Sequence, residues 1–264
     1  MVADAVDAVA VTRPRIRVQG AVKSFSGRVV VNVDDLVLGD RPIEGLIGPN
    51  GAGKTTLMRM IMHSTPLDRG EISLLPVDGR DVVLSSLPAH RIARHGVVKS
   101  NQVVMDFDKL TIWDSLLLAV AEARYEQPHR IFSERAVFER HEDEIRHYLA
   151  YFGFADPAAF AMSAGEKKLL DIVRCLLLRP TVLLLDEPTA GLPEDLTERL
   201  MDVVRDLAAG GTSVVIVEHD LNVIWSLCDV VTFMAEGSVL LKGAPQTIRE
   251  NRTVVEKYLG HGHV

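Results

Sequence analysis

The sequence predicts an α/β fold with a parallel sheet, and two observations carry this prediction. Short runs of β-branched and apolar residues alternate with helical patterns along most of the chain, which is the order of elements in an α/β core. Two of these runs, 181–185 and 213–217, consist almost wholly of apolar residues. Strands of this kind are expected where both faces of a parallel sheet are covered by other elements.

Composition agrees with a globular domain and excludes several other classes of protein. The 264 residues are 47% hydrophobic and 25% charged, as in ordinary folded proteins. The formal net charge of −7 disfavours a generic nucleic-acid binder, which would carry a basic face, so no nucleic-acid partner is expected. The longest unbroken apolar stretch, Leu116–Ala121, is far shorter than the ~20 residues of a membrane-spanning helix. Cys175 and Cys228 lie in apolar runs and are expected to be buried thiols.

The first part of the chain predicts a flexible tail followed by strands and one helix. Residues 1–14 contain two Asp and no basic region at their start, so they do not resemble a secretory signal. Strands are predicted at Arg15–Phe25 and Arg28–Leu38, where β-branched residues partly alternate with polar ones. A short apolar strand at Ile43–Ile47 ends in a Gly-rich turn, and a helix is predicted at Lys54–His63.

The middle of the chain has no convincing strand between about residues 112 and 179. A charged helix is predicted at Glu134–Tyr151, because apolar residues recur near one face of it. These apolar residues are Phe138, Ile145, Leu149 and Phe152. Residues 98–178 are therefore expected to form a mostly helical insertion.

The turn after the third strand matches the phosphate-binding pattern G-x-x-x-x-G-K-[ST], with the required strand before it and helix after it. Glycines let backbone N–H groups approach phosphate oxygens at a helix N-terminus. Lys54 is expected to reach the β- and γ-phosphates, and the Thr55 hydroxyl to bind Mg²⁺. The candidate nucleotide contacts here are Gly48, Pro49, Asn50, Gly51, Ala52, Gly53, Lys54, Thr55 and Thr56.

The apolar run Val182–Leu185 ends in two carboxylates, Asp186 and Glu187. Ligands of open α/β sheets bind beyond the carboxyl ends of the strands. Asp186 is therefore expected to hold Mg²⁺, and Glu187 to polarise an attacking water as a general base. The alternative is that these carboxylates only cap a helix, but their pairing with a phosphate loop favours the catalytic interpretation.

The segment Met162-Ser163-Ala164-Gly165-Glu166 resembles the L-S-G-G-Q signature of ATP-binding cassette (ABC) ATPases. The chain also carries an aromatic residue, a phosphate loop, a Gln, an acidic strand and a His in the order of that family. The resemblance covers about residues 15–260. The residues that complete the set are Phe25, Gln102 and His219.

The resemblance implies a role for each of these residues. Phe25 is expected to stack on adenine, with a core position as the alternative. Gln102 is expected to contact Mg²⁺ or its water, and its alternative is an ordinary polar loop residue. His219 is expected to hydrogen-bond the γ-phosphate and to help orient the water. Ser163 and Gly165 are expected to bind the γ-phosphate of ATP held by a second subunit.

Two departures from the family pattern have physical consequences. Glu166 replaces the neutral Gln of the signature, and Ser163-x-x-Glu166 before an apolar helix predicts a capping box. Lys167 and Lys168 are the nearby cations that would offset the charge of Glu166. Pro193 stands where the family usually has an Asp, which puts in doubt the contact that this Asp makes across the dimer.

The resemblance implies the fold of a P-loop NTPase: a core with a parallel sheet, an antiparallel β subdomain and a helical insertion. It divides the chain into a nucleotide-binding core (15–97 and 179–240), a helical subdomain (98–178) and a C-terminal helical tail (241–264). It also implies a dimer with a second ABC ATPase subunit. Val103–Trp113 would receive a helix of a permease, or else fill the core of the insertion.

The C-terminal part, Gly237–Pro245 and Asn251–Gly260, resembles ATPase subunits of branched-chain amino-acid and urea importers. The implied protein hydrolyses ATP at the cytoplasmic face of the inner membrane, as a peripheral subunit beside integral permeases and, indirectly, a solute-binding protein. The main alternative is the ATPase of a lipopolysaccharide exporter. Two further hypotheses are an ABC ATPase that acts on DNA or ribosomes and a catalytically silent cassette.

Overall fold

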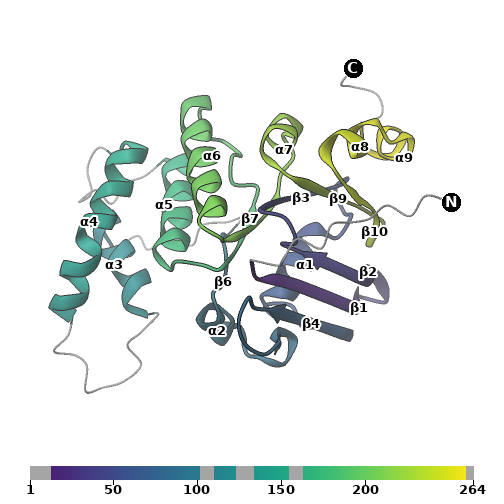
Figure 1. Cartoon of the computed structure of the whole chain (residues 1–264), viewed down its shortest axis with the longest axis horizontal. Coiled ribbons are helices and arrows are strands. Elements are labelled where there is room, and N and C mark those ends of the chain that lie inside the picture. The colour runs from purple at the N-terminus through teal and green to yellow at the C-terminus, as the bar shows by residue number, and fades with distance from the viewer. Residues whose placement is uncertain (1–12, 102–109, 123–133, 155–162, 260–264) are drawn as a thin grey trace.

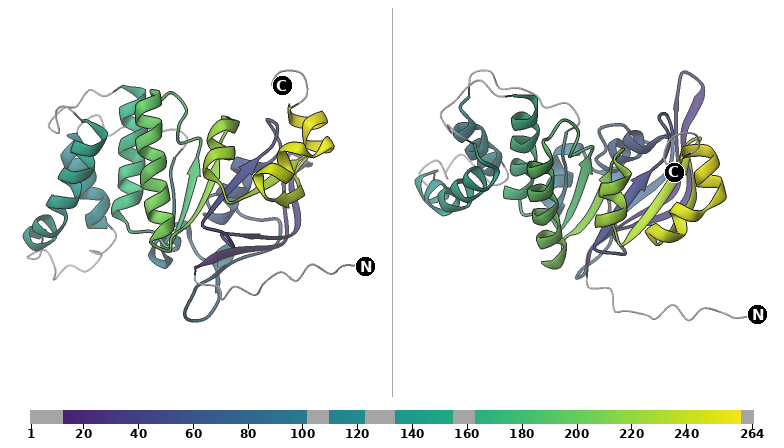
Figure 2. Two further views of the ribbon diagram at one scale, coloured as in Figure 1. Left: turned by 45° about the horizontal axis from the view of Figure 1, so that its top comes forward. Right: turned by 90° about the horizontal axis from the view of Figure 1, so that it is seen from above.

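The protein consists of two β-sheets and the helices around them (Figure 1). The structure is a computed structural model that describes residues 13–101, 110–122, 134–154 and 163–259. One sheet is antiparallel and belongs to the N-terminal part of the chain. The other contains the strand that precedes the phosphate loop. Figure 2 shows the helical insertion, which contains α3 (Ile112–Glu122) and α4 (Glu134–Phe152), at the end of the molecule away from the antiparallel sheet.

The antiparallel sheet has the strand order β2-β1-β4-β5. Its strands are β1 (Arg15–Phe25), β2 (Arg28–Leu38), β4 (Arg69–Leu75) and β5 (Val82–Val83). Ser26 and Gly27 join β1 to β2 with φ angles of 49° and 80°, and two positive φ angles suit the twist of a two-residue hairpin. The antiparallel β subdomain expected from the family resemblance is therefore confirmed.

The second sheet has the order β10-β9-β3-β8-β7-β6. All neighbouring pairs are parallel except β9 and β10, which are antiparallel. The strands are β3 (Ile43–Ile47), β6 (Val97–Lys99), β7 (Val182–Asp186), β8 (Ser213–Val217), β9 (Val230–Ala235) and β10 (Ser238–Gly243). Because parallel neighbours end at one edge, the residues that follow β3, β7 and β8 are brought close together.

Every residue of β3, β7 and β8 is buried, which explains why most of their residues are apolar. The side chains of β7 alternate between two cores: Leu183 and Leu185 pack with the helices on one face. Val182 and Leu184 pack on the other face with the antiparallel sheet and helix α1 (Lys54–Ile61). Because other elements cover both faces of this sheet, the protein has the predicted α/β class.

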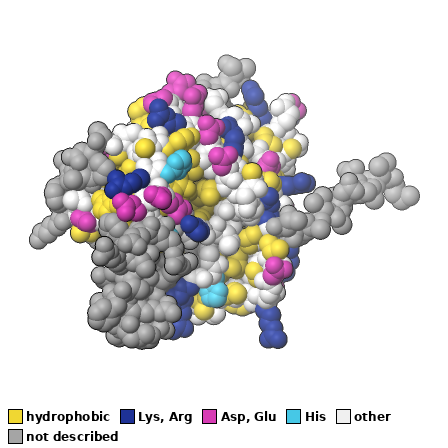
Figure 3. All heavy atoms as spheres, turned by 60° about the vertical axis from the view of Figure 1, so that its left-hand side comes forward, with side chains coloured by type: hydrophobic (Ala, Val, Ile, Leu, Met, Phe, Trp, Pro, Cys, Tyr) yellow, Lys and Arg dark blue, Asp and Glu magenta, His cyan; other side chains and the backbone are white. Residues whose placement is uncertain are grey.

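The helices that cover the sheets are unequal in length. Besides α1, α3 and α4, they are α2 (Ala89–Ile92), α5 (Ala164–Leu177), α6 (Glu194–Ala209), α7 (Leu221–Leu227), α8 (Pro245–Glu250) and α9 (Arg252–Val254). Further helical turns occupy Leu84–Ser86, Ala93–His95 and Val255–Leu259. On the face shown in Figure 3, acidic and basic side chains are interspersed among hydrophobic ones. Among the described residues, no helix combines the length and the apolar character needed to cross a bilayer.

Several predicted boundaries differ from the structure. The helix predicted at Lys54–His63 ends at Ile61, because His63 has a positive φ of 48° that no α-helix accommodates. The strand predicted at 181–185 lies one residue later, at Val182–Asp186, and the helix predicted at Glu134–Tyr151 extends to Phe152.

The proposed division of the chain cuts two strands. Residue 98 lies inside β6, and residue 241 lies inside β10, so the C-terminal segment begins as a strand. At the other end, Arg13 of the expected tail donates from Nη1 to the carbonyl oxygens of Ala208 and Thr212 (3.4 and 3.2 Å). Residues 1–12 of that tail lie outside the described residues. Both cysteines are buried, as expected.

Candidate functional site

The loop between β3 and α1 needs glycine at two positions. Gly48 has a φ of 148°, and a Cβ atom there would overlap the carbonyl oxygen of Met234. Gly53 has a φ of 99°, and its Cβ would lie 2.6 Å from the carbonyl oxygen of Val30. No other residue type fits these backbone positions without displacing a neighbouring strand. The loop is therefore held in a tight conformation that leads into the N-terminus of α1.

Lys54 begins α1 and is 6% exposed. Its Nζ donates to the carbonyl oxygens of Gly48 (2.5 Å) and Pro49 (3.1 Å), so the side chain folds back across the loop. Burial lowers the pKa of Lys54, whereas the negative charges of Glu187 and Asp186 act in the opposite direction. The ammonium group is thus held inside the loop by two backbone carbonyl oxygens.

A cavity of about 220 Å³ opens beside this loop. It brings together four segments that are distant in sequence. Three of them follow β3, β7 and β8, which end at the same edge of the sheet, and the fourth is Val30 of β2. Its lining residues are Val30, Asn50, Gly51, Ala52, Gly53, Lys54, Thr55, Thr56, Glu187 and His219. Most of the residues predicted to contact nucleotide therefore share one cavity with the two predicted catalytic residues that the structure describes.

Glu187 follows β7 in an unusual backbone conformation with a φ of 52°. Its N–H donates to the carbonyl oxygen of Val217 (2.8 Å). Its own carbonyl oxygen accepts from Nζ of Lys168 (2.6 Å), which also donates to the carbonyl oxygen of Ala190 (3.1 Å). Nε2 of His219 lies 3.0 Å from Oε1 of Glu187. Non-glycine residues at positive φ are strained, and surrounding contacts of this kind hold such strain in place.

Glu218, at the end of β8, is a positioning residue that the sequence analysis missed. Its side chain is buried, and Oε1 accepts from the N–H (2.8 Å) and the hydroxyl (2.6 Å) of Thr189. Oε2 accepts from the N–H of His219 (3.0 Å). Glu218 therefore ties the segment that carries Glu187 to the segment that carries His219. The available signal was a carboxylate placed directly after the apolar strand Ser213–Val217.

Asp186 ends β7 with a side chain that is fully buried and lies 3.1 Å from Nζ of Lys99, measured at Oδ2. Neither carboxylate oxygen has a hydrogen bond from the described residues. The backbone N–H of Asp186 donates to the hydroxyl of Ser100 (3.1 Å), which fixes the end of the strand. A buried carboxylate without hydrogen-bond donors suits a cation, and hard cations such as Mg²⁺ prefer oxygen ligands of this kind.

The predicted capping box is confirmed at the start of α5. Oγ of Ser163 accepts from the N–H of Glu166 (3.2 Å), and Oε2 of Glu166 accepts from the N–H of Ser163 (2.8 Å). Lys168 contacts the segment after β7 instead of Glu166. Ser163 and Gly165 do not line the cavity beside the phosphate loop. Within one chain, the structure therefore separates the signature residues from the other candidate nucleotide contacts.

Phe25 lies at the end of β1 and is 48% exposed. The core position considered as an alternative is therefore wrong. Nζ of Lys23 lies 5.4 Å from the centre of the Phe25 ring, at the distance of a cation–π contact. Phe25 does not line the cavity that contains Lys54.

Gln102 lies outside the described residues, but the residue before it is firmly attached. The N–H of Asn101 donates to Oδ2 of Asp171 (2.6 Å), and Nδ2 of Asn101 donates to Oδ1 (3.0 Å). Asp171 belongs to α5, so Asn101 is anchored to the same helix that Ser163 caps.

The predicted permease-binding segment Val103–Trp113 is only partly described, because 102–109 lie outside the described residues. Ile112 is buried, and Trp113 packs against the same core cluster. The guanidinium of Arg146 lies 5.0 Å from the centre of the Trp113 ring. These two residues of the segment contribute to the core of the helical insertion.

Comparison with known proteins identifies similar chains along almost the full length. A family model described as "ABC transporter" matches residues 34–190. The chain is 33% identical to the high-affinity branched-chain amino acid transport ATP-binding protein BraF of Pseudomonas aeruginosa, over 94% of this chain and 99% of the relative. It is 32% identical to LivG of Escherichia coli, with the same coverage. It is 31% identical to the lipopolysaccharide export system ATP-binding protein LptB of Haemophilus influenzae, over 90% and 94% of the two chains.

Solved structures show the same fold. A nucleotide-free ATP-binding cassette from an ABC transporter superposes with a TM-score of 0.74 at 23% identity, covering 94% of this chain and all of the other. An ADP conformation of an ATP-binding cassette superposes with a TM-score of 0.73 at 23% identity, over 94% and 99% of the two chains.

Proposed function

The chain belongs to the ABC transporter family, and from this premise we propose that it hydrolyses ATP to drive solute import through partner permeases. The observation that carries the proposal is the cavity shared by the phosphate loop, Glu187 and His219. Glu187 and His219 line this cavity next to the loop that would hold the phosphates. The expected fold class of a P-loop ABC ATPase is confirmed by the family match and by the solved cassettes.

The phosphate loop and Lys54 would bind ATP. Backbone N–H groups at the N-terminus of α1 favour anionic oxygens. Nζ of Lys54, now bonded to the carbonyl oxygens of Gly48 and Pro49, would turn toward the β- and γ-phosphates. Phe25, which is exposed, would supply an aromatic face for adenine.

Asp186, the hydroxyl of Thr55 and Gln102 would hold Mg²⁺, and the buried carboxylate of Asp186 without hydrogen bonds fits this assignment. When bound, Mg²⁺ neutralises charge on the phosphate oxygens. Glu187 would take a proton from the attacking water at a carboxylate oxygen. His219, 3.0 Å from Glu187, would orient that water and hydrogen-bond the γ-phosphate.

A second copy of the signature would complete each site. Ser163 and Gly165 lie at the start of α5, away from the cavity of their own chain, so they would serve the ATP of a second ABC ATPase subunit. The negative charge of Glu166 would be partly offset at the N-terminus of α5, where its carboxylate accepts the N–H of Ser163.

The proposed solute is a branched-chain amino acid, urea or a similar small molecule. The relatives BraF and LivG, named for branched-chain amino acid transport, match 94% of this chain. The protein would act at the cytoplasmic face of the membrane with integral permeases, which would receive solute from a solute-binding protein. No nucleic-acid partner is proposed.

Reconstitution tests this proposal directly. The chain would be co-expressed with candidate permease subunits from the same organism, purified in detergent and inserted into vesicles. We expect uptake of labelled leucine or urea that requires ATP on the side of the ATPase. The Lys54→Ala complex is the matched control and should not transport. Lipopolysaccharide-stimulated ATPase activity without solute uptake would favour the exporter, to which LptB belongs, and would contradict import.

A further inference from the structure

Lys99 places a positive charge against Asp186. The two charged groups are 3.1 Å apart, the Asp186 side chain is fully buried and the Lys99 side chain is 12% exposed. Within the part of the chain that the structure describes, this is the one ion pair of Asp186, and no hydrogen bond reaches either oxygen. The negative charge of Asp186 also acts on Lys54 and favours its charged form. Lys54, however, donates its hydrogen bonds to the phosphate loop.

A buried carboxylate needs a compensating cation, because removing its charge from water is unfavourable. Lys99 provides this compensation when no metal is bound. A second cation near the same oxygens is repelled by the first, since charges a few ångströms apart interact strongly at a site of low dielectric. Lys99 and a divalent metal ion would thus compete for the carboxylate of Asp186.

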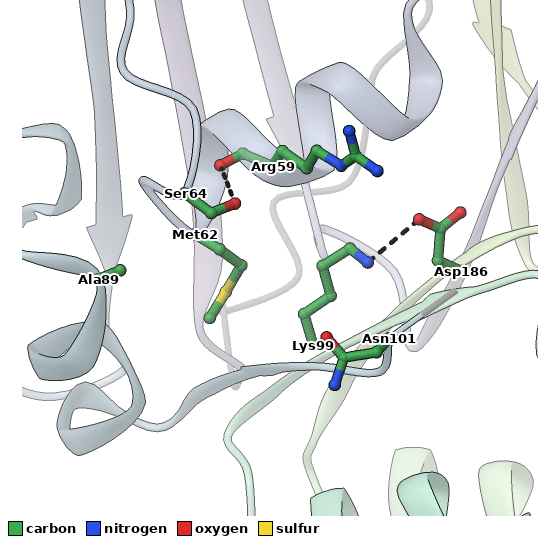
Figure 4. A pocket seen from close by; sticks show the side chains of 7 residues that line it. All are labelled: Arg59, Met62, Ser64, Ala89, Lys99, Asn101 and Asp186. Carbon is green, nitrogen blue, oxygen red and sulfur yellow. Dashed lines mark hydrogen bonds and ion pairs between the residues drawn. The ribbon is translucent and has the colours of Figure 1, made fainter. Parts of the chain in front are cut away.

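The structure gives Lys99 room to leave Asp186. A cavity of about 360 Å³ adjoins the pair, and Figure 4 shows the Lys99 side chain extending across it toward Asp186, with Arg59 of α1 nearby. Its lining residues are Arg59, Met62, Ser64, Ala89, Lys99, Asn101 and Asp186. Nζ of Lys99 also donates to the carbonyl oxygen of Ser100 (2.8 Å), a partner that does not depend on Asp186.

We propose that Lys99 is a positioning residue that competes with Mg²⁺ for Asp186. Lys99 holds the carboxylate in the metal-free protein and moves into the cavity when nucleotide and Mg²⁺ bind. Lys99 thereby weakens Mg²⁺ binding, and it neutralises the charge of Asp186 in the metal-free protein. The inference rests on the proposed function, because that proposal makes Asp186 a metal ligand.

Metal binding by the full chain tests this inference without measuring activity. The chain saturated with ADP is titrated with Mg²⁺ by calorimetry, and with Mn²⁺ as a paramagnetic probe. We expect Lys99→Met to lower the half-saturating metal concentration roughly threefold to tenfold, as relief of one charge repulsion predicts. The affinity for ADP in EDTA should stay the same. Lys99→Arg keeps the charge and should keep the wild-type value.

Arg59→Met is the matched control in the same cavity, because it removes a cation for which no contact with Asp186 is found among the described residues. It should shift the half-saturating concentration less than Lys99→Met does. An equal shift would show a general effect of charge and would overturn the specific role of Lys99.

An unchanged or higher half-saturating concentration in Lys99→Met, with normal ADP affinity in EDTA, would also overturn the inference. Should Lys99→Met fold poorly, Lys99→Gln replaces it and is held to the same outcomes. Asp186→Asn separates the inference from the proposed function. If Asp186→Asn leaves metal binding intact, the metal assignment itself is wrong. If it weakens metal binding while the Lys99 variants do not change it, only the inference fails.

Discussion

Nε2 of His219 lies 3.0 Å from Oε1 of Glu187, although the residues are 32 positions apart. The contact exists because β7 and β8 are parallel neighbours that end at the same edge. Glu218 reinforces it by accepting N–H groups from both Thr189 and His219. The pair is therefore held in place by two neighbouring strand ends.

Glu187→Gln should reduce ATP hydrolysis about 10²- to 10⁴-fold, because the amide cannot accept a proton from water. Nucleotide binding should persist, since the phosphate loop is unchanged. Phosphate release by the assembled complex and ATP affinity in the same preparation give the two measurements. Unaltered hydrolysis would refute the assignment of Glu187 as general base.

Lys54→Ala should weaken ATP binding at least about tenfold, the effect of losing one charge-assisted contact of roughly 1.5–3 kcal/mol. Calorimetric titration with ATP checks this. Arg205→Ala is the control, because it removes an exposed cation of α6 that pairs with Asp202 away from the cavity. If Lys54→Ala binds ATP as tightly as Arg205→Ala, the phosphate-loop interpretation is wrong.

Glu166→Ala should lower the free energy of unfolding by about 1 kcal/mol, since half of the capping box is lost. Glu166→Gln should come close to wild type, because Gln also completes a capping box. Urea unfolding followed by circular dichroism measures both variants. Equal losses in Glu166→Ala and Glu166→Gln would show that the carboxylate charge matters more than the cap.

Neither cysteine should react with iodoacetamide in the native protein. Burial raises the pKa of Cys228 to about 12 and raises that of Cys175 further above its usual range. Near neutral pH, almost no reactive thiolate is therefore present. Mass spectrometry should find both thiols alkylated only after denaturation, and rapid modification of the native chain would contradict their burial.

The sequence predicted two strands of the nucleotide-binding sheet well, because residues 181–185 and 213–217 are apolar enough to require two covered faces. It predicted the capping box at Ser163 for a similar reason: the signal is local and chemical. Helix ends were less predictable, as His63 shows, since its backbone conformation depends on the turn that follows α1.

Contacts between distant segments could not be predicted from the sequence. Lys99 meets Asp186 because β6 pairs with β7, and no local pattern encodes that pairing. Lys168 was expected near Glu166, but it bonds to the carbonyl oxygens of Glu187 and Ala190. The roles proposed for Phe25, Gln102 and Gly165 remain predictions from the family resemblance.

Helix α5 connects three parts of the site within one rigid element. Ser163 is its N-cap residue. Nζ of Lys168 donates to the carbonyl oxygen of Glu187, and Asp171 accepts hydrogen bonds from Asn101. A displacement of Ser163 would therefore be passed to the backbone of Glu187 and to Asn101 together. The two segments would move in step, because both are hydrogen-bonded to α5.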